Sequence, residues 1–280
     1  MNPLPLRSQP TLSICALLAV RNEAHYLRHL LPRLAGESID VVLIDNGSND
    51  DSAALYARHM GNPILQVVNL PYRGHFSLSE QLGIKQQVQD RLPHDWILHH
   101  DADEILEHRE SGKSLRDAIE EADAAGANAL NFEEFVFLPE PGAPTPPLAD
   151  YSRHLRYYFF APQSNRLNRA WKRRTPLSNH QSGGHCLAGD QLRLFPQNHI
   201  LRHFIVLSQA HALEKYLHRT FDPRDLGYQW HGNRLSFTSD NLRIPRASPY
   251  LHTLPAPDSK AFVRTAPASK HFWEWTDSSC

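Results

Sequence analysis

Apolar and polar positions along the first hundred residues form short apolar runs separated by longer amphipathic segments. The apolar runs have strand length and occupy residues 13–20, 41–45, 64–68 and 95–101. Between them, apolar residues recur at helical spacing over 25–36, 52–61 and 77–92. Parallel strands need crossover connections, and right-handed crossovers place the helices on both faces of the sheet. The pattern therefore predicts an α/β fold with a mostly parallel central sheet.

Beyond residue 110 the pattern is less regular. The elements expected there are a helix over 114–126, a strand over 128–138, a proline-rich surface loop over 139–147, strands within 157–162, 191–196 and 199–207, and a helix over 208–221 that Ser208 caps. We divide the chain into one domain over 10–245, with halves 10–110 and 111–245, and an irregular tail over 246–280.

Composition narrows the class of protein. Lysine and arginine total 29 and aspartate and glutamate 30, a formal net charge of −1, so no nucleic-acid partner is expected. Three scattered cysteines argue against a disulfide framework or a cysteine zinc site. The proline-broken start MNPLPLRSQP is unlike a signal peptide, and no window approaches the roughly 20 apolar residues of a membrane span. We expect a cytoplasmic protein, with peripheral contact to the inner face of the membrane left open.

Charged residues gather where the expected strands end. Asp101, Asp103 and Glu104 directly follow the apolar run 96–100. In parallel α/β sheets, ligands bind outside the carboxyl ends of the strands. Buried carboxylates need a cation or hydrogen bonds, and oxygen ligands favour magnesium or manganese. The alternative is that these acids only begin a helix, where the helix dipole favours them.

Three segments together resemble known motifs. AVRNEAHYLRHLL, VVLIDNGSNDDSAALY and DWILHHDADEIL resemble, in order and interval, three motifs of the family 2 glycosyltransferases, over about residues 12–110. The resemblance implies a GT-A fold, a nucleotide-sugar donor and a divalent metal, Mn²⁺ or Mg²⁺. The roles it implies are a contact to the nucleotide base for Asp45, the nucleotide pocket for Arg21, Asn22 and Glu23, a place near the ribose for Asp101, and metal coordination on the donor diphosphate for Asp103.

The catalytic base and the remaining metal ligands lie in the second half. Inverting members of this fold use a carboxylate to deprotonate the acceptor hydroxyl. Glu134, on the expected strand over 128–138, is our candidate, and Asp190 is its competitor. An ordinary surface role for either acid stays open. His203 and His185 are candidates for completing the metal shell.

Two further segments carry suggestive residues. The basic run RLNRAWKRR, residues 166–174, is expected to be a solvent-exposed face. The alternative is that this run binds phosphate groups or acidic lipid headgroups. In GYQWHGNR, Trp230 and His231 are candidates for a surface on which an acceptor sugar stacks.

The sequence therefore predicts a metal-dependent glycosyltransferase. It would move a sugar from a UDP- or GDP-sugar to a hydroxyl of a glycan, a lipid-linked acceptor or a small molecule, with inversion. A haloacid dehalogenase-type phosphohydrolase is disfavoured, since its Asp-x-Asp follows the first strand and this one follows the fourth. A nucleotidyltransferase is disfavoured because the first strand lacks a glycine-rich, lysine-containing loop. The remaining alternative is an inactive nucleotide-sugar-binding module.

Overall fold

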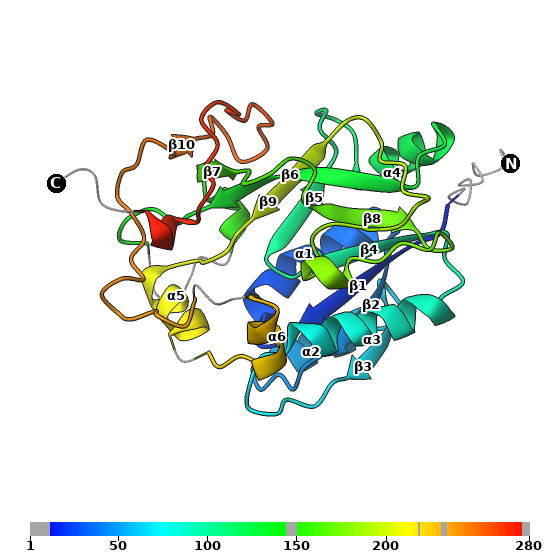
Figure 1. The fold of residues 1–280 in the computed structure, drawn as a ribbon, viewed down its shortest axis with the longest axis horizontal. Coiled ribbons are helices and arrows are strands. Elements are labelled where there is room, and N and C mark those ends of the chain that lie inside the picture. Colours follow the sequence, from blue (N-terminus) through cyan, green and yellow to red (C-terminus); the bar gives the residue numbers. More distant parts are fainter. Residues whose placement is uncertain (1–11, 144–149, 218, 231–233, 276–280) are drawn as a thin grey trace, which may run out of the picture.

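The computed structural model describes residues 12–143, 150–217, 219–230 and 234–275. The N-terminal stretch compared above with a signal peptide, and residues 144–147 of the expected loop, lie outside these ranges. In Figure 1 the first half of the chain, in blue and cyan, lies at the lower right. Its elements are β1 (Ile14–Val20), α1 (Ala24–Gly36), β2 (Asp40–Asp45), α2 (Ser52–His59), β3 (Ile64–Asn69), α3 (Leu78–Arg91) and β4 (Trp96–Asp101).

The strands of the first half form a parallel sheet. They lie in the order β4, β1, β2, β3, and each neighbouring pair is parallel. Side chains of β1 alternate between the two faces: Ala16 and Leu18 join the core that contains α1, whereas Cys15 and Leu17 join the core against which Val88 of α3 packs. Helices therefore cover both faces, and the predicted α/β fold with a parallel centre is confirmed.

The second half extends this sheet with strands of mixed direction. Its elements are β5 (Glu104–Glu107), α4 (Leu115–Ala124), β6 (Ala129–Phe137), β7 (Arg156–Phe160), β8 (Asn168–Lys172), β9 (His199–His203), α5 (Gln209–Tyr216), α6 (Pro223–Gly227) and β10 (His252–Thr253). Strand β8 pairs antiparallel with β4 on one side and β6 on the other. Strand β9 lies between β6 and β5. The two halves thus share one sheet.

Several helices begin where the sequence places a capping residue. The side chains of Ser77, Ser114 and Ser208 cap α3, α4 and α5. Asp51 occupies the N-cap position of α2 without a side-chain hydrogen bond. Its neighbour Asp50 instead accepts from the first backbone amides of both α1 and α2. This carboxylate joins the two helix starts that flank the carboxyl ends of β1 and β2.

Two expectations for the second half are wrong. Residues 191–196 form no strand, only an isolated bridge between Leu194 and Ala129. The side chain of Asn128 bonds to the backbone of Gln191 and Arg193, and so replaces part of a strand ladder. The basic run is also not a solvent-exposed face, because it contains β8 at the centre of the sheet, where Arg169 is 6% exposed.

The structure contains elements that the pattern did not predict. Residues 104–107, at the end of the first half, form β5, and residues 223–227 form α6. The described tail is irregular apart from β10 and a single 3-10 turn, yet it packs into the core: Phe262 stacks on Phe135 with ring centroids 3.9 Å apart. None of the helices in the described ranges combines the length and the apolar character that crossing a membrane requires.

Helix α6 is tied to the start of α3. The carboxylate of Asp225 accepts hydrogen bonds from the amides of Leu78 and Ser79, in the first turn of α3. Asp222 accepts one from the hydroxyl of Ser77 at 3.0 Å. The amide of Phe76 bonds to the Thr220 carbonyl at 2.8 Å. Residues 220–225 therefore supply hydrogen-bond acceptors to residues at the N-terminus of a helix in the first half.

Candidate functional site

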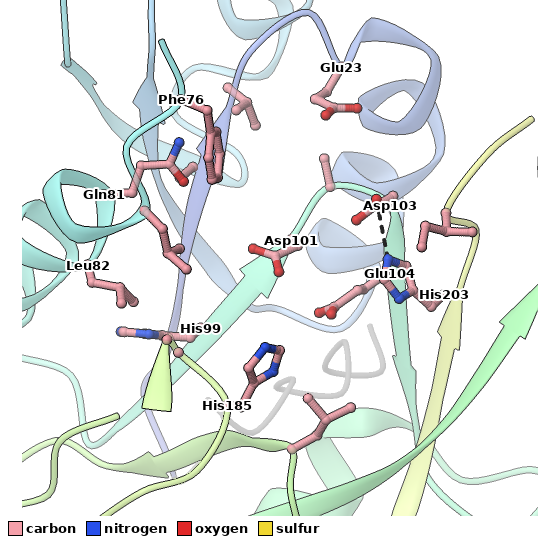
Figure 2. A pocket seen from close by; sticks show the side chains of 18 of the residues that line it. Glu23, Phe76, Gln81, Leu82, His99, Asp101, Asp103, Glu104, His185 and His203 are labelled. Carbon is pink, nitrogen blue, oxygen red and sulfur yellow. Dashed lines mark ion pairs between the residues drawn. The ribbon is translucent and has the colours of Figure 1, made fainter. Parts of the chain in front are cut away.

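A cavity of about 220 Å³ lies at the carboxyl ends of β1 and β4. Glu23 follows β1, the turn 101–104 joins β4 to β5, and residues of β8, β9 and α5 complete the wall. Figure 2 shows Asp101, Asp103 and Glu104 on that turn, with Glu23 beyond one end of it and His185 beyond the other. The structure thus brings together residues that the sequence placed at separate strand ends.

Two of the three acids on the turn are paired with basic side chains of β8 and α3. The guanidinium of Arg169 contacts Glu104, which is 1% exposed, and lies 3.1 Å from Asp101. The ammonium of Lys85 lies 3.6 Å from Asp101. Burial alone would raise the pKa of the Asp101 carboxyl, but Arg169 and Lys85 hold it at about 2. Asp101 is therefore ionised near neutral pH.

The third acid, Asp103, meets cations from α5 and β9. Its Oδ2 accepts a hydrogen bond from the ammonium of Lys215 at 2.8 Å and lies 3.4 Å from Nε2 of His203. The other ring nitrogen of His203 lies 2.6 Å from Glu134, whose second oxygen contacts Arg166. Burial would lower the pKa of His203, but the two carboxylates raise it well above its ordinary value. His203 is therefore an imidazolium.

A glycine-containing loop forms the wall opposite the acids. Gly183 has φ +65° and packs against Trp230, which lies 3.2 Å from where a Cβ would stand. The side chain of Asn179 donates to the carbonyl of Gly184 and to Nδ1 of His99. Because His99 accepts at Nδ1, its proton lies on Nε2. The loop thereby fixes which nitrogen of His99 can donate.

Four buried polar atoms around the cavity have no hydrogen-bond partner among the described residues. They are Nε2 of His99, Oε2 of Glu104, Nε of Arg169 and Nδ1 of His185. Buried polar groups are nearly always paired, and leaving one unpaired costs about 1–3 kcal/mol. Unpaired buried atoms are the exception in folded proteins, and these four belong to residues that line one cavity.

The family model for "Glycosyl transferase family 2" matches residues 15–173, more than half of the 280 residues. The chain belongs to glycosyl transferase family 2. The matched region runs from β1 to the end of β8 and so contains the turn 101–104 and Arg169. Lys215 and His203 lie beyond it. No curated protein matches the chain.

Solved structures with a similar fold include TarS residues 1–349 from S. aureus. It has 12% sequence identity and a TM-score of 0.43, and the match covers 68% of this chain and 60% of TarS 1–349. The same TarS fragment in complex with UDP has a TM-score of 0.43 at 12% identity, covering 83% and 75%. The mannosyltransferase Ktr4p from S. cerevisiae in complex with GDP has 7% identity and a TM-score of 0.24, covering 51% and 45%. TM-scores this low do not support any inference about activity.

Some residues predicted from the family motifs do not line the cavity. Asn22 is exposed and its side chain bonds to Asn49, so it joins the loops after β1 and β2. Asp45 accepts from the amide and the hydroxyl of Ser48 through Oδ1 and so shapes its own turn. A contact between Asp45 and a nucleotide base stays a prediction. Arg21 does line the cavity, where it stacks on Tyr72 at 3.4 Å.

The two candidates for the catalytic base differ in their placement. Asp190 is exposed in a turn that does not line the cavity, so the structure disfavours it. Glu134 is buried and lines the cavity. Burial would raise the pKa of Glu134, but Arg166 and His203 hold it well below its ordinary value. A carboxylate paired in this way is a weak proton acceptor, and its role as the base stays a prediction.

The predicted metal ligands do not form a metal site in this arrangement. Among the described residues, no three His, Cys, Asp or Glu side chains are placed to hold one ion. An ion bound to Asp103 would adjoin the Lys215 ammonium; at roughly 4 Å and an effective dielectric of 20, their repulsion is about 8 kcal/mol. His185 is neutral, since burial lowers its pKa to about 3, but it lies apart from Asp103 and His203 in Figure 2. The residues present therefore do not fit a divalent metal.

The motifs gave no sign of Lys85, and for the run 166–174, which contains Arg169, phosphate binding was only the alternative to an exposed face. Lys85 reaches the cavity from the buried side of α3, and Arg169 from the interior of β8. Leu167, Ala170 and Trp171, the apolar residues within the basic run, were the available signal that this segment is a buried strand. Of the acceptor candidates, Trp230 packs against Gly183, and His231 lies outside the described residues.

Proposed function

We propose that this protein transfers a sugar from a UDP- or GDP-sugar to a hydroxyl of a glycan, a lipid-linked acceptor or a small molecule. The observation that carries the proposal is the cavity lined by charged side chains at the strand ends that bear the family motifs. In the reaction, the acceptor oxygen bonds to the sugar C1, the bond from C1 to the diphosphate breaks, and the acceptor proton passes to a base. Inversion at C1 is part of the proposal.

The acceptor has a candidate site of its own. A second cavity, of about 300 Å³, shares Glu134 and Arg166 with the first. Its lining combines the exposed amide side chains of Gln163 and Asn165 with the ring of Phe159. Amides that bond hydroxyls, beside an apolar ring, suit a sugar, so this composition favours a glycan acceptor. A divalent metal, expected from the motifs, stays a prediction that the side-chain arrangement does not support.

Thermal unfolding with nucleotides and nucleotide sugars tests the proposal. We expect UDP, GDP or one of their sugars to raise the melting temperature, because a ligand at about 100 times its Kd stabilises by about 2.7 kcal/mol. Asp101→Ala should abolish the shift, whereas Asp190→Ala, an exposed acid outside the cavity, should retain it. Absence of any shift in the wild type would refute nucleotide binding.

Turnover separates the enzyme from an inactive binding module. Incubation with the stabilising nucleotide sugar should release nucleoside diphosphate, through transfer to an added acceptor or slowly to water. Stabilisation without release, across a panel of saccharide acceptors, would favour the binding module over the glycosyltransferase.

A further inference from the structure

Basic side chains outnumber acidic ones around the cavity. Among the described residues, seven Lys and Arg side chains and five Asp and Glu side chains line it, a formal excess of two positive charges. A site for magnesium or manganese instead presents carboxylate oxygens that are free to coordinate. The cavity therefore carries an uncompensated positive charge, which a negatively charged ligand would neutralise.

Each aspartate of the Asp-x-Asp segment already has a cationic partner on the chain. Lys215 bonds to Asp103 at 2.8 Å, and Arg169 to Asp101 at 3.1 Å. His203 directs both ring nitrogens at carboxylates, Glu134 and Asp103. The positions that would hold a metal and its ligands are therefore taken by side-chain cations.

The same cations retain capacity for a further anion. The Lys215 ammonium has three donors, and its described acceptors are Asp103 and, at 3.4 Å, the Ile205 carbonyl. Arg169 also lines the cavity, so its positive charge acts on an anion there, although its terminal nitrogens already bond Asp101, Glu104 and the Gly184 carbonyl. Arg219 also lines the cavity and lies over the ring of Phe76, with its Cζ 4.3 Å from the centroid. Ammonium and guanidinium groups form short, charge-assisted hydrogen bonds with phosphate oxygens.

We propose that the cavity binds the donor diphosphate with Lys215 and Arg169, supported by Lys85 and Arg219, in place of a divalent metal ion. The inference rests on the proposed function, since it names how the same site holds the same donor. These cations would also stabilise the negative charge that develops on the diphosphate as the bond to the sugar breaks. Donor binding and transfer are then independent of metal.

Isothermal titration of the intact wild-type protein with UDP and with GDP, each in EDTA and in Mn²⁺, tests the inference directly. We expect the nucleotide that binds to have the same affinity, within about threefold, in both conditions. An affinity that Mn²⁺ raises tenfold or more would overturn the inference and leave the proposed function standing. Absence of binding in both conditions would overturn the proposed function and the inference with it.

Substitutions of Lys215 test its role in diphosphate binding. In EDTA, Lys215→Met should weaken diphosphate binding at least about tenfold, the lower end of what a charged hydrogen bond contributes. It should leave the affinity for the nucleoside unchanged, and Lys215→Arg should recover most of the loss. Lys113→Met is the control, because Lys113 is likewise ion-paired, with Glu110 and Glu121, but does not line the cavity. Undiminished diphosphate binding by a folded Lys215→Met protein would refute the role of Lys215.

Discussion

The carboxyl end of β4 presents acids to the cavity, whereas β8, β9 and α5 present the cations that meet them. The acids lie in the half of the chain with a regular strand and helix pattern. Arg169 reaches Glu104 across 65 positions of sequence, and Lys215 reaches Asp103 across 112. Neither half is a site alone, because the first would carry unpaired buried acids and the second unpaired buried cations.

The largest effect is expected from breaking that pairing at Arg169. Arg169→Met leaves Glu104 buried without its cation, and removing one partner of a buried pair costs about 3–5 kcal/mol of unfolding free energy. Urea denaturation measures the loss. Arg174→Met, an exposed arginine two residues beyond β8, should change stability by less than about 0.5 kcal/mol.

A double variant decides whether the loss comes from the pairing. Adding Glu104→Gln to Arg169→Met removes the unpaired charge, so the double variant should be more stable than Arg169→Met alone. Losses that simply add would show that the two halves are joined by packing and not by charge.

A smaller effect is expected in the loop that faces the acids. Gly183→Ala forces a Cβ into a left-handed conformation, 3.2 Å from Trp230, and should cost about 2 kcal/mol. Gly126→Ala has a similar φ, +76°, with nothing within 4 Å of the new Cβ, and should cost about 1 kcal/mol. Thermal unfolding compares them. Equal losses would mean that the Trp230 contact does not constrain the loop.

The smallest effect is expected at the tie between α6 and α3. Asp225→Ala removes the acceptor of two amides in the first turn of α3 and should cost about 1 kcal/mol. Hydrogen exchange should rise at Leu78 and Ser79 in particular. Asp240→Ala, whose side chain is 87% exposed, should change neither stability nor exchange there. Protected amides in Asp225→Ala would mean that α3 does not depend on α6.

Sequence patterns predicted the first half well because its elements depend on local signals. Apolar periodicity located β1 to β4 and α1 to α3. In the second half, the predicted cap Ser208 correctly located the start of α5. Family motifs correctly placed Glu23 and the Asp101–Asp103 pair at one cavity. In these segments the information lies within a few neighbouring residues.

The remaining features depend on contacts between distant residues. Arginines usually lie at the surface, and although the apolar neighbours of Arg169 indicate a buried strand, only the fold shows that the strand lies between β4 and β6. The expected strand over 191–196 failed because a single side chain, Asn128, meets its backbone. His203 was predicted as a metal ligand, and only the fold shows that its two ring nitrogens face Glu134 and Asp103. The residue types were enough to select candidate site residues. The ionic partners of those residues became visible only in the folded structure.

The tie between α6 and α3 also bears on the order in which the molecule forms. Asp225 lies 147 positions beyond the amide of Leu78 that it caps, and contacts of such long separation form late and slow folding. During synthesis, α3 emerges well before this cap and must wait for it with its first amides exposed to water. Because α3 supplies Gln81, Leu82 and Lys85 to the cavity wall, we expect that wall to be fully ordered only once residue 225 has docked. The ability to bind a ligand would then depend on a segment that is synthesised long after the wall itself.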